Sequence, residues 1–194
     1  MNAFNRLGAA ITIGSLSLAM LGCGGSSSSS STEEKAQIQA DISLQQTPLN
    51  TLAISDYALD KCIKETGREY IEDITTLVCN NKGIEMLEGI DGLTQLKSLH
   101  LSFNEINDIT PLVSLTKLKT LYLGGNQIHN LDALSELTEL TDLAIQKNYI
   151  QDLSPLQSLS TLKSLHTHSN QIQDFTILSA LELNELSGKS RQES

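Results

Sequence analysis

The stretch Leu96-Lys97-Ser98-Leu99-His100-Leu101-Ser102-Phe103-Asn104-Glu105-Ile106 sets a pattern that repeats along most of this 194-residue chain. Asparagines recur at Asn126, Asn148 and Asn170, and the differences 126−104, 148−126 and 170−148 are all 22. Fixed periods of about 20 to 50 residues are typical of solenoids and other repeat arrays. Because each unit of such an array buries its apolar face against the next, the period predicts a domain built by stacking.

Projected over residues 74–183, the pattern predicts five repeats that begin at Ile74, Leu96, Leu118, Leu140 and Leu162. In the second repeat seven positions should point inward: Leu96, Leu99, Leu101, Ile106, Ile109, Leu112 and Leu115. The Leu-x-Leu step has the period of two that a β-strand requires, so successive strands are expected to form a parallel sheet. Cys79 and Lys82 in the first repeat and Thr167 in the last depart from the pattern, as terminal repeats commonly do.

Polar residues in each repeat have predictable tasks. A buried asparagine amide both donates and accepts hydrogen bonds, so the four asparagines are expected to satisfy backbone groups in the bend that leaves each strand. Beyond the bend, Thr110-Pro111 and Ser154-Pro155 predict a capping residue followed by proline at the first position of a short helical turn. Asp132 and Thr176 occupy the equivalent cap positions.

The repeated frame Leu-x-x-Leu-x-Leu-x-x-Asn-x-Ile resembles the leucine-rich repeat. This resemblance implies an α/β repeat solenoid with a short parallel concave sheet and short helical turns on the convex side. Asp56-x-x-Leu59-x-x-Cys62 and Leu77-x-Cys79 resemble the N-terminal cap of secreted bacterial leucine-rich repeat proteins of the internalin-like kind.

The cap is expected over residues 52–73, with a short helix that begins after Ser55 or Asp56 and ends at Gly67. Residues 184–194 are expected to be a C-terminal tail. Leu183 and Leu186 either cover the last repeat or leave an open edge that could pair with a second copy, and the oligomeric state stays open.

Two other folds share parts of this pattern. A period of 22 residues also occurs in long amphipathic helices of the apolipoprotein type, but the Leu-x-Leu steps and the periodic prolines oppose an uninterrupted helix. An interior proline costs a helix about 3 kcal/mol. A coiled coil is excluded because no register of 3.5 residues survives.

The first part of the chain predicts export and anchoring. Residues 1–22 carry Arg6 and then an apolar stretch shorter than the roughly 20 residues that cross a bilayer, which predicts a cleaved signal peptide. Met20-Leu21-Gly22-Cys23 resembles a bacterial lipobox, so Cys23 is the expected lipidation site of a lipoprotein. Residues 23–51, with serines from Ser26 to Ser31, are expected to form a flexible tether. A generic signal peptide with a fortuitous cysteine is the alternative.

The resemblance to lipoproteins also suggests a place in the cell. In double-membrane bacteria, a residue other than Asp after the lipidated cysteine implies sorting to the outer membrane, and here that residue is Gly24. The protein is therefore expected to be exported and lipid-anchored to the cell envelope, at the outer membrane. Whether it faces the periplasm or the surface stays open.

The other two cysteines form an even pair. In an exported, oxidising compartment Cys62 and Cys79 are expected to form a disulfide, and two buried free thiols are the alternative. Neither a C-x-x-C motif nor a neighbouring histidine gives them the spacing of zinc ligands.

Charge and motifs narrow the function classes. The formal net charge is −10 and no basic cluster is present, which argues against a nucleic-acid partner. The sequence contains no G-x-S-x-G, H-E-x-x-H or P-loop motif. We therefore expect no catalysis, no cofactor and no metal ion.

The outward positions of the strands define a candidate binding face. They include a set of aromatic, basic and amide side chains predicted to contact a partner: His100, Phe103, Tyr122, Gln146, Lys147, His166 and His168. Aromatic side chains are common hot spots, although Phe103 could instead fold back over the bend. His166-x-His168 lacks a third metal ligand nearby. Gly124 and Gly125 either leave a shallow spot for a partner's side chain or ease the strand end.

These features predict a membrane-anchored recognition module that binds a protein through the concave sheet. The partner's identity stays open. The resemblance to internalin-like proteins also permits a surface adhesin that binds another cell. A purely structural role in the envelope is the third alternative.

Overall fold

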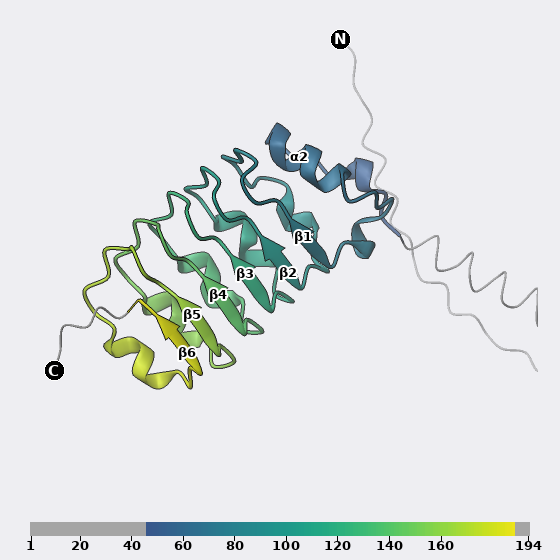
Figure 1. Ribbon diagram of the computed structural model, residues 1–194. Coiled ribbons are helices and arrows are strands. Elements are labelled where there is room, and N and C mark those ends of the chain that lie inside the picture. The colour runs from purple at the N-terminus through teal and green to yellow at the C-terminus, as the bar shows by residue number, and fades with distance from the viewer. Residues whose placement is uncertain (1–45, 189–194) are drawn as a thin grey trace, which may run out of the picture. The chain divides into compact units, whose positions relative to one another are not determined.

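A computed structural model of the protein describes residues 46–188, which form a solenoid of stacked repeats (Figure 1). The predicted signal peptide, Cys23 and all but the last residues of the tether lie outside the described residues. Within this part of the chain, no helix is both long and apolar enough to cross a membrane.

Six short strands lie side by side in sequence order and form one parallel sheet (Figure 1). Their bounds are β1 Thr76–Val78, β2 Ser98–His100, β3 Thr120–Tyr122, β4 Asp142–Ala144, β5 Ser164–His166 and β6 Glu185–Ser187. The central leucine of each strand pairs with that of the next, so Leu77, Leu99, Leu121, Leu143, Leu165 and Leu186 form one row. The predicted parallel sheet is confirmed.

The core consists of the apolar positions of the repeat. All seven inward positions predicted in the second repeat are buried, and so are their equivalents in the third and fourth. Each repeat thus adds one layer of leucine and isoleucine to a continuous core. Thr167, which stands in a leucine position, is also buried and donates its hydroxyl hydrogen to the carbonyl of Ser187.

The asparagine side chains form the predicted ladder. The amide of Asn148 accepts from Ile128 N at 3.0 Å and donates to the carbonyls of Leu123 and Ile145, both at 3.0 Å. Equivalent bonds to two successive repeats are made by Asn104, Asn126 and Asn170. Each amide therefore ties its repeat to the one before it.

Short 3-10 helices lie on the side of the solenoid opposite the sheet. They are η3 Ile90–Gly92, η4 Thr110–Ser114, η5 Asp132–Glu136, η6 Ser154–Ser158 and η7 Thr176–Ala180. Pro111 and Pro155 are the second residues of η4 and η6, one position later in each helix than predicted. The predicted capping residues are wrong, because they are the first residues of their helices and the caps are the apolar residues before them: Ile109, Leu131, Leu153 and Phe175.

The acceptor lies two residues upstream of each predicted cap. Asp108 Oδ1 accepts from both the backbone N–H and the hydroxyl of Thr110, at 2.8 and 2.6 Å. Asp152 and Asp174 hold Ser154 and Thr176 in the same way. The hydroxyl and backbone hydrogen bonds from Thr110 lower the pKa of Asp108 below its ordinary value. Such side-chain turns compete locally with capping.

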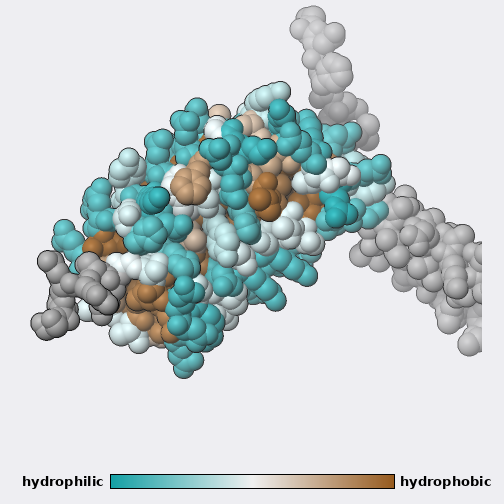
Figure 2. Space-filling view, viewed as in Figure 1, coloured by the Kyte–Doolittle hydropathy of each residue, from teal (hydrophilic) through white to brown (hydrophobic). Residues whose placement is uncertain are grey.

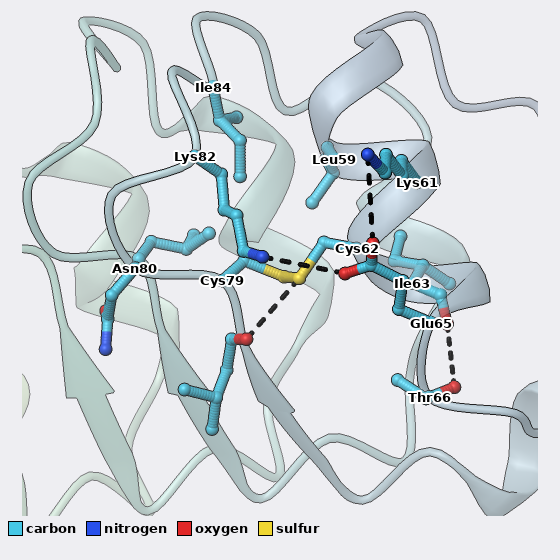
Figure 3. Close-up of a disulfide and its surroundings, with 12 residues drawn as sticks. Leu59, Lys61, Cys62, Ile63, Glu65, Thr66, Cys79, Asn80, Lys82 and Ile84 are labelled. Atoms are coloured by element: carbon cyan, nitrogen blue, oxygen red, sulfur yellow. Dashed lines mark hydrogen bonds and ion pairs between the residues drawn. A yellow bond between two sulfur atoms is a disulfide. The ribbon is translucent and has the colours of Figure 1, made fainter.

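The N-terminal cap contains α2 (Tyr57–Lys64) and the disulfide between Cys62 and Cys79, as predicted (Figure 3). Asp56 starts the helix, since its Oδ1 accepts from Leu59 N at 2.9 Å. Its Oδ2 accepts from Glu85 N at 2.9 Å and Met86 N at 3.2 Å, which ties the cap to the first repeat. Helix and disulfide together cover the first rung of the core.

Two predicted boundaries need correction. The cap begins before residue 52, because Leu49 is buried in η1 (Leu49–Thr51) and Pro48 pairs with Tyr70. The predicted tail, residues 184–194, is not all tail, since β6 extends the sheet within it. Ser164 pairs with Glu185, a separation of 21 (185−164), so the last rung falls out of the 22-residue register.

Candidate functional site

The outward side of the sheet, which we call the sheet face, presents the residues that flank each buried leucine. The flanking residues are partly exposed in β2, β3 and β5. Strand register places His100 beside Tyr122, and Ala144 beside His166. Figure 2 shows hydrophobic patches among hydrophilic atoms, including one at the end of the solenoid near β6.

His100 and Tyr122 form a contacting pair at the middle of the face. Their ring centroids lie 4.5 Å apart with an interplanar angle of 53°, a tilted arrangement that aromatic pairs favour. Ser98 Oγ lies 3.0 Å from His100 Nε2. Burial lowers the pKa of His100 below its ordinary value, so this ring is mostly neutral at neutral pH.

Phe103 and Lys147 meet across a glycine. The Phe103 side chain is 54% exposed, and Lys147 Nζ lies 5.7 Å from its ring centroid, within cation–π range. Between their two rungs is Gly125, where an added Cβ would lie 2.7 Å from Phe103 Cδ1. The ring therefore rests on the glycine and stays open to solvent instead of covering the core.

The bend that follows each strand requires a left-handed backbone. Equivalent positions in five repeats have positive φ: Asn81 (53°), Phe103 (59°), Gly125 (73°), Lys147 (56°) and Ser169 (59°). A bulky residue with positive φ is uncommon and carries strain. The sheet face thus holds an exposed phenylalanine at a position where glycine or asparagine is favoured.

The shallow spot suggested at Gly124 and Gly125 is filled in this structure. The Phe103 ring occupies the space at Gly125. At Gly124 an added Cβ would lie 2.5 Å from Gln146 Nε2, so the Gln146 amide occupies that space. Gln146 Oε1 is buried without a hydrogen-bond partner among the described residues.

His166 and His168 have different surroundings. His166 Nδ1 lies 2.7 Å from Ser187 Oγ, and its Nε2 lies 3.9 Å from Glu185 Oε1. His168 is exposed and lies 3.2 Å from Ser169 Oγ. Between residues 46 and 188, no three His, Cys, Asp or Glu side chains gather as metal ligands would.

Two neighbours of this face could not be predicted from the repeat pattern. Glu185 and Ser187 contact His166 from β6, and the change of period from 22 to 21 hid them. Together with His166 they place a hydroxyl and a carboxylate near the two ring nitrogens of one imidazole, the groups that a catalytic triad uses. The carboxylate is beyond hydrogen-bond distance, so we assign these contacts to holding the His166 ring.

A hollow of about 370 Å³ lies on the opposite side, between η4 and η5. Its lining includes Asp108, Asp132, Glu136 and the exposed Val113. Asp132 already accepts from the Asn130 amide at 2.9 Å. This acidic surface contrasts in charge with the sheet face.

Comparison with known proteins identifies the repeat type. The family described as leucine-rich repeats (two copies) matches residues 94–136 and 116–158. An internalin (inlF) from Listeria monocytogenes has a similar structure, with a TM-score of 0.67, 32% sequence identity, and coverage of 75% of this chain and 46% of that one. No protein with a curated description matches the sequence.

Two further solved structures share the fold. The functional domain of InlJ from Listeria monocytogenes, which includes a cysteine ladder, has a TM-score of 0.50 and 20% identity over 71% of this chain and 42% of that one. A leucine-rich repeat protein from Leptospira interrogans has a TM-score of 0.52 and 24% identity over 56% of this chain and 30% of that one. This chain thus spans less than half of each of these three structures.

Proposed function

We propose that this leucine-rich repeat solenoid is a recognition module that binds a protein partner through its sheet face. The observation that carries the proposal is Phe103. Its side chain is 54% exposed and its backbone is strained, so burial in the core does not explain a phenylalanine at this position. Solenoids with parallel sheets use such surfaces for binding.

The neighbours of Phe103 support the same role. Lys147 Nζ lies over the Phe103 ring, and His100 and Tyr122 contact each other on β2 and β3, so aromatic and polar side chains are present on neighbouring rungs. Tyrosine and other aromatic residues are enriched among hot spots, where they pack into a partner and exclude water. Six strands spaced by about 4.8 Å span roughly 24 Å, which suits a modest epitope. On this proposal the protein acts by binding and does not catalyse a reaction.

We also propose that the module is anchored by lipid at Cys23. The support is the apolar N-terminal stretch, the lipobox-like Met20-Leu21-Gly22-Cys23 and the serine tract that follows. Fatty acyl chains on the sulfur and the new amine would supply the two signals that stable attachment needs. Cys23→Ser should abolish incorporation of labelled palmitate and shift the protein to the soluble fraction, whereas Ser26→Ala should change neither. Membrane retention of Cys23→Ser without label would contradict the anchor.

An adhesin that binds another cell is the second candidate, and the similarity to an internalin at 32% identity favours it. It requires the sheet face to be reachable from outside intact cells. Protease digestion of intact cells separates the two: an adhesin is cleaved, and a periplasmic module is protected until the envelope is permeabilised. A structural envelope protein, the third alternative, predicts loss of envelope integrity on deletion that face variants do not reproduce.

Crosslinking capture from intact envelopes tests the proposed face. The variant Phe103→Ala, Tyr122→Ala is compared with the wild-type protein and with Tyr57→Ala, Val113→Ala, which removes two exposed apolar side chains away from the face. Mass spectrometry should show a bound protein that only the face variant loses. A bound protein list that is the same for all three proteins would contradict binding through the sheet face.

A further inference from the structure

The sheet face has the opposite charge balance to the rest of the chain. The relevant residues run from the one before each strand to the left-handed position after it, namely 75–81, 97–103, 119–125, 141–147 and 163–169. Within them are the cations Lys97, Lys119, Lys147 and Lys163 and one carboxylate, Asp142, and the sixth strand adds a second carboxylate, Glu185. The whole chain has 13 cations to 23 carboxylates. A basic face on an acidic protein is therefore a local feature.

Three of the four lysines have no carboxylate partner among the described residues. Elsewhere on the solenoid and its cap, Lys61, Lys64 and Lys82 each pair with a carboxylate. On the face, Lys163 pairs with Glu182 at 3.6 Å, whereas no ion pair involves Lys97, Lys119 or Lys147. In a chain with excess acid, these three charges remain available to an external anion.

Carboxylates avoid the central part of the face. The segments that form β2 and β3 and their flanks contain none, and Asp142 of β4 is hydrogen-bonded by the Thr141 hydroxyl at 2.6 Å. Acidic side chains instead line the hollow on the opposite side, between η4 and η5. A ligand that approaches the sheet thus meets positive charge first, and such a field attracts an anionic ligand.

The unpaired lysines lie at both ends of the strands. Lys97 and Lys119 precede β2 and β3 on adjacent rungs, where Lys119 N donates to Lys97 O at 2.8 Å. Lys147 follows β4 at the other end and lies over the Phe103 ring. Between the two ends, Ser98, Thr120 and the His100–Tyr122 pair offer hydrogen bonds and an aromatic surface. An anionic ligand laid across the strands would have cations on either side.

We propose that the partner segment recognised by the sheet face is an acidic stretch of protein, rich in Asp and Glu. This inference rests on the proposed function and specifies its partner class. The six strands at a spacing of about 4.8 Å span roughly 24 Å, which an extended chain covers with about seven residues at roughly 3.3 Å each. Carboxylates of the segment pair with Lys97, Lys119 and Lys147, while its aliphatic atoms pack on Phe103 and Tyr122.

The test uses the full chain in a non-ionic detergent and a fluorescein-labelled peptide of eight glutamates, with an eight-glutamine peptide as reference. The glutamate peptide should bind at least about tenfold more tightly than the glutamine peptide at low salt and weaken as salt screens the charges. Equal binding of the two peptides would overturn the inference. So would tighter binding of a heparin oligosaccharide or a single-stranded oligonucleotide of similar charge, because the face would then select another class of polyanion.

A matched pair of variants locates the binding. Lys97→Gln, Lys119→Gln should weaken binding of the glutamate peptide about fivefold, as expected for two exposed charge contacts. Lys61→Gln, Lys64→Gln changes the net charge by the same amount on α2 and should leave binding within about twofold. An equal loss in both variants would show non-specific attraction and overturn the assignment to the face. Circular dichroism of both variants checks that the fold is intact.

Failure of this inference and failure of the proposed function give different results. If Phe103→Ala, Tyr122→Ala releases a captured protein but Lys97→Gln, Lys119→Gln does not, the sheet face binds a partner that is not selected by acidity. If neither variant changes capture, the proposed function itself is wrong.

Discussion

Removing one amide from the asparagine ladder should weaken the whole stack. Asn148 is 6% exposed, and its side chain hydrogen-bonds four backbone groups of two repeats, the longest bond being to the carbonyl of Gln146 at 3.3 Å. In Asn148→Ala the N–H of Ile128 loses its acceptor, and an unsatisfied buried N–H costs about 1–3 kcal/mol. The carbonyls of Leu123 and Ile145 keep one donor each, from Asn126 and Asn170, so their loss is smaller.

The expected loss of unfolding free energy is therefore about 2–4 kcal/mol in total. Urea unfolding followed by circular dichroism, with the disulfide intact, measures it. Asn107→Ala is the control, since Asn107 is exposed and should change stability by no more than about 0.5 kcal/mol. Asn148→Asp keeps the acceptor but places a carboxylate against carbonyl oxygens, so it should destabilise at least as much at neutral pH. If Asn148→Ala costs no more than Asn107→Ala, the ladder does not hold the repeats together.

Three further perturbations have defined outcomes. Reduction of Cys62–Cys79, which closes a separation of 17 residues, should lower the unfolding free energy by about 3 kcal/mol in urea titrations; an unchanged midpoint would contradict a structural bridge. Burial opposes ionisation of Asp56, but hydrogen bonds from backbone N–H groups outweigh it and lower its pKa. The ionised Asp56 therefore stabilises the fold above its unfolded pKa, about 4, and this stabilisation is lost as the pH falls through the pKa of the folded state. The melting temperature of Asp56→Asn should consequently fall less between pH 7 and 3 than that of the wild-type protein. Gly125→Ala should cost about 1–2 kcal/mol and displace Phe103, because φ is +73° and the new Cβ would clash with the ring; unchanged stability and binding would refute this packing.

Sequence alone predicted the repeating interior because leucine or isoleucine fills every inward position of the second, third and fourth repeats. Leucines at regular positions such as Leu99 and Leu121 predict a buried row. A buried amide such as that of Asn126 needs hydrogen-bond partners, which the backbone of the bend supplies. The disulfide followed from the pairing of two cysteines in a chain that its N-terminal sequence predicts to be exported. These features depend on residue type and spacing, which the sequence displays directly.

Other features depend on neighbours that lie 21 or 22 residues apart or on backbone angles. The sixth strand was missed because Glu185 stands 21 residues after Ser164 and no asparagine of the ladder follows this strand. The filling of the Gly124 space by Gln146 arises between rungs and has no signal in either repeat alone. The strain at Phe103 could not be predicted either, since phenylalanine, unlike glycine, does not indicate a left-handed backbone.

Side-specific photocrosslinking tests the central claim, recognition through the sheet face, most directly. Benzoylphenylalanine is placed at position 103 in one protein and at position 113, in η4 on the opposite side, in the other. Irradiation of intact envelopes should give a discrete crosslinked protein from position 103 and none from position 113. A crosslinked protein from position 113 alone, or the same one from both positions, would contradict the claim.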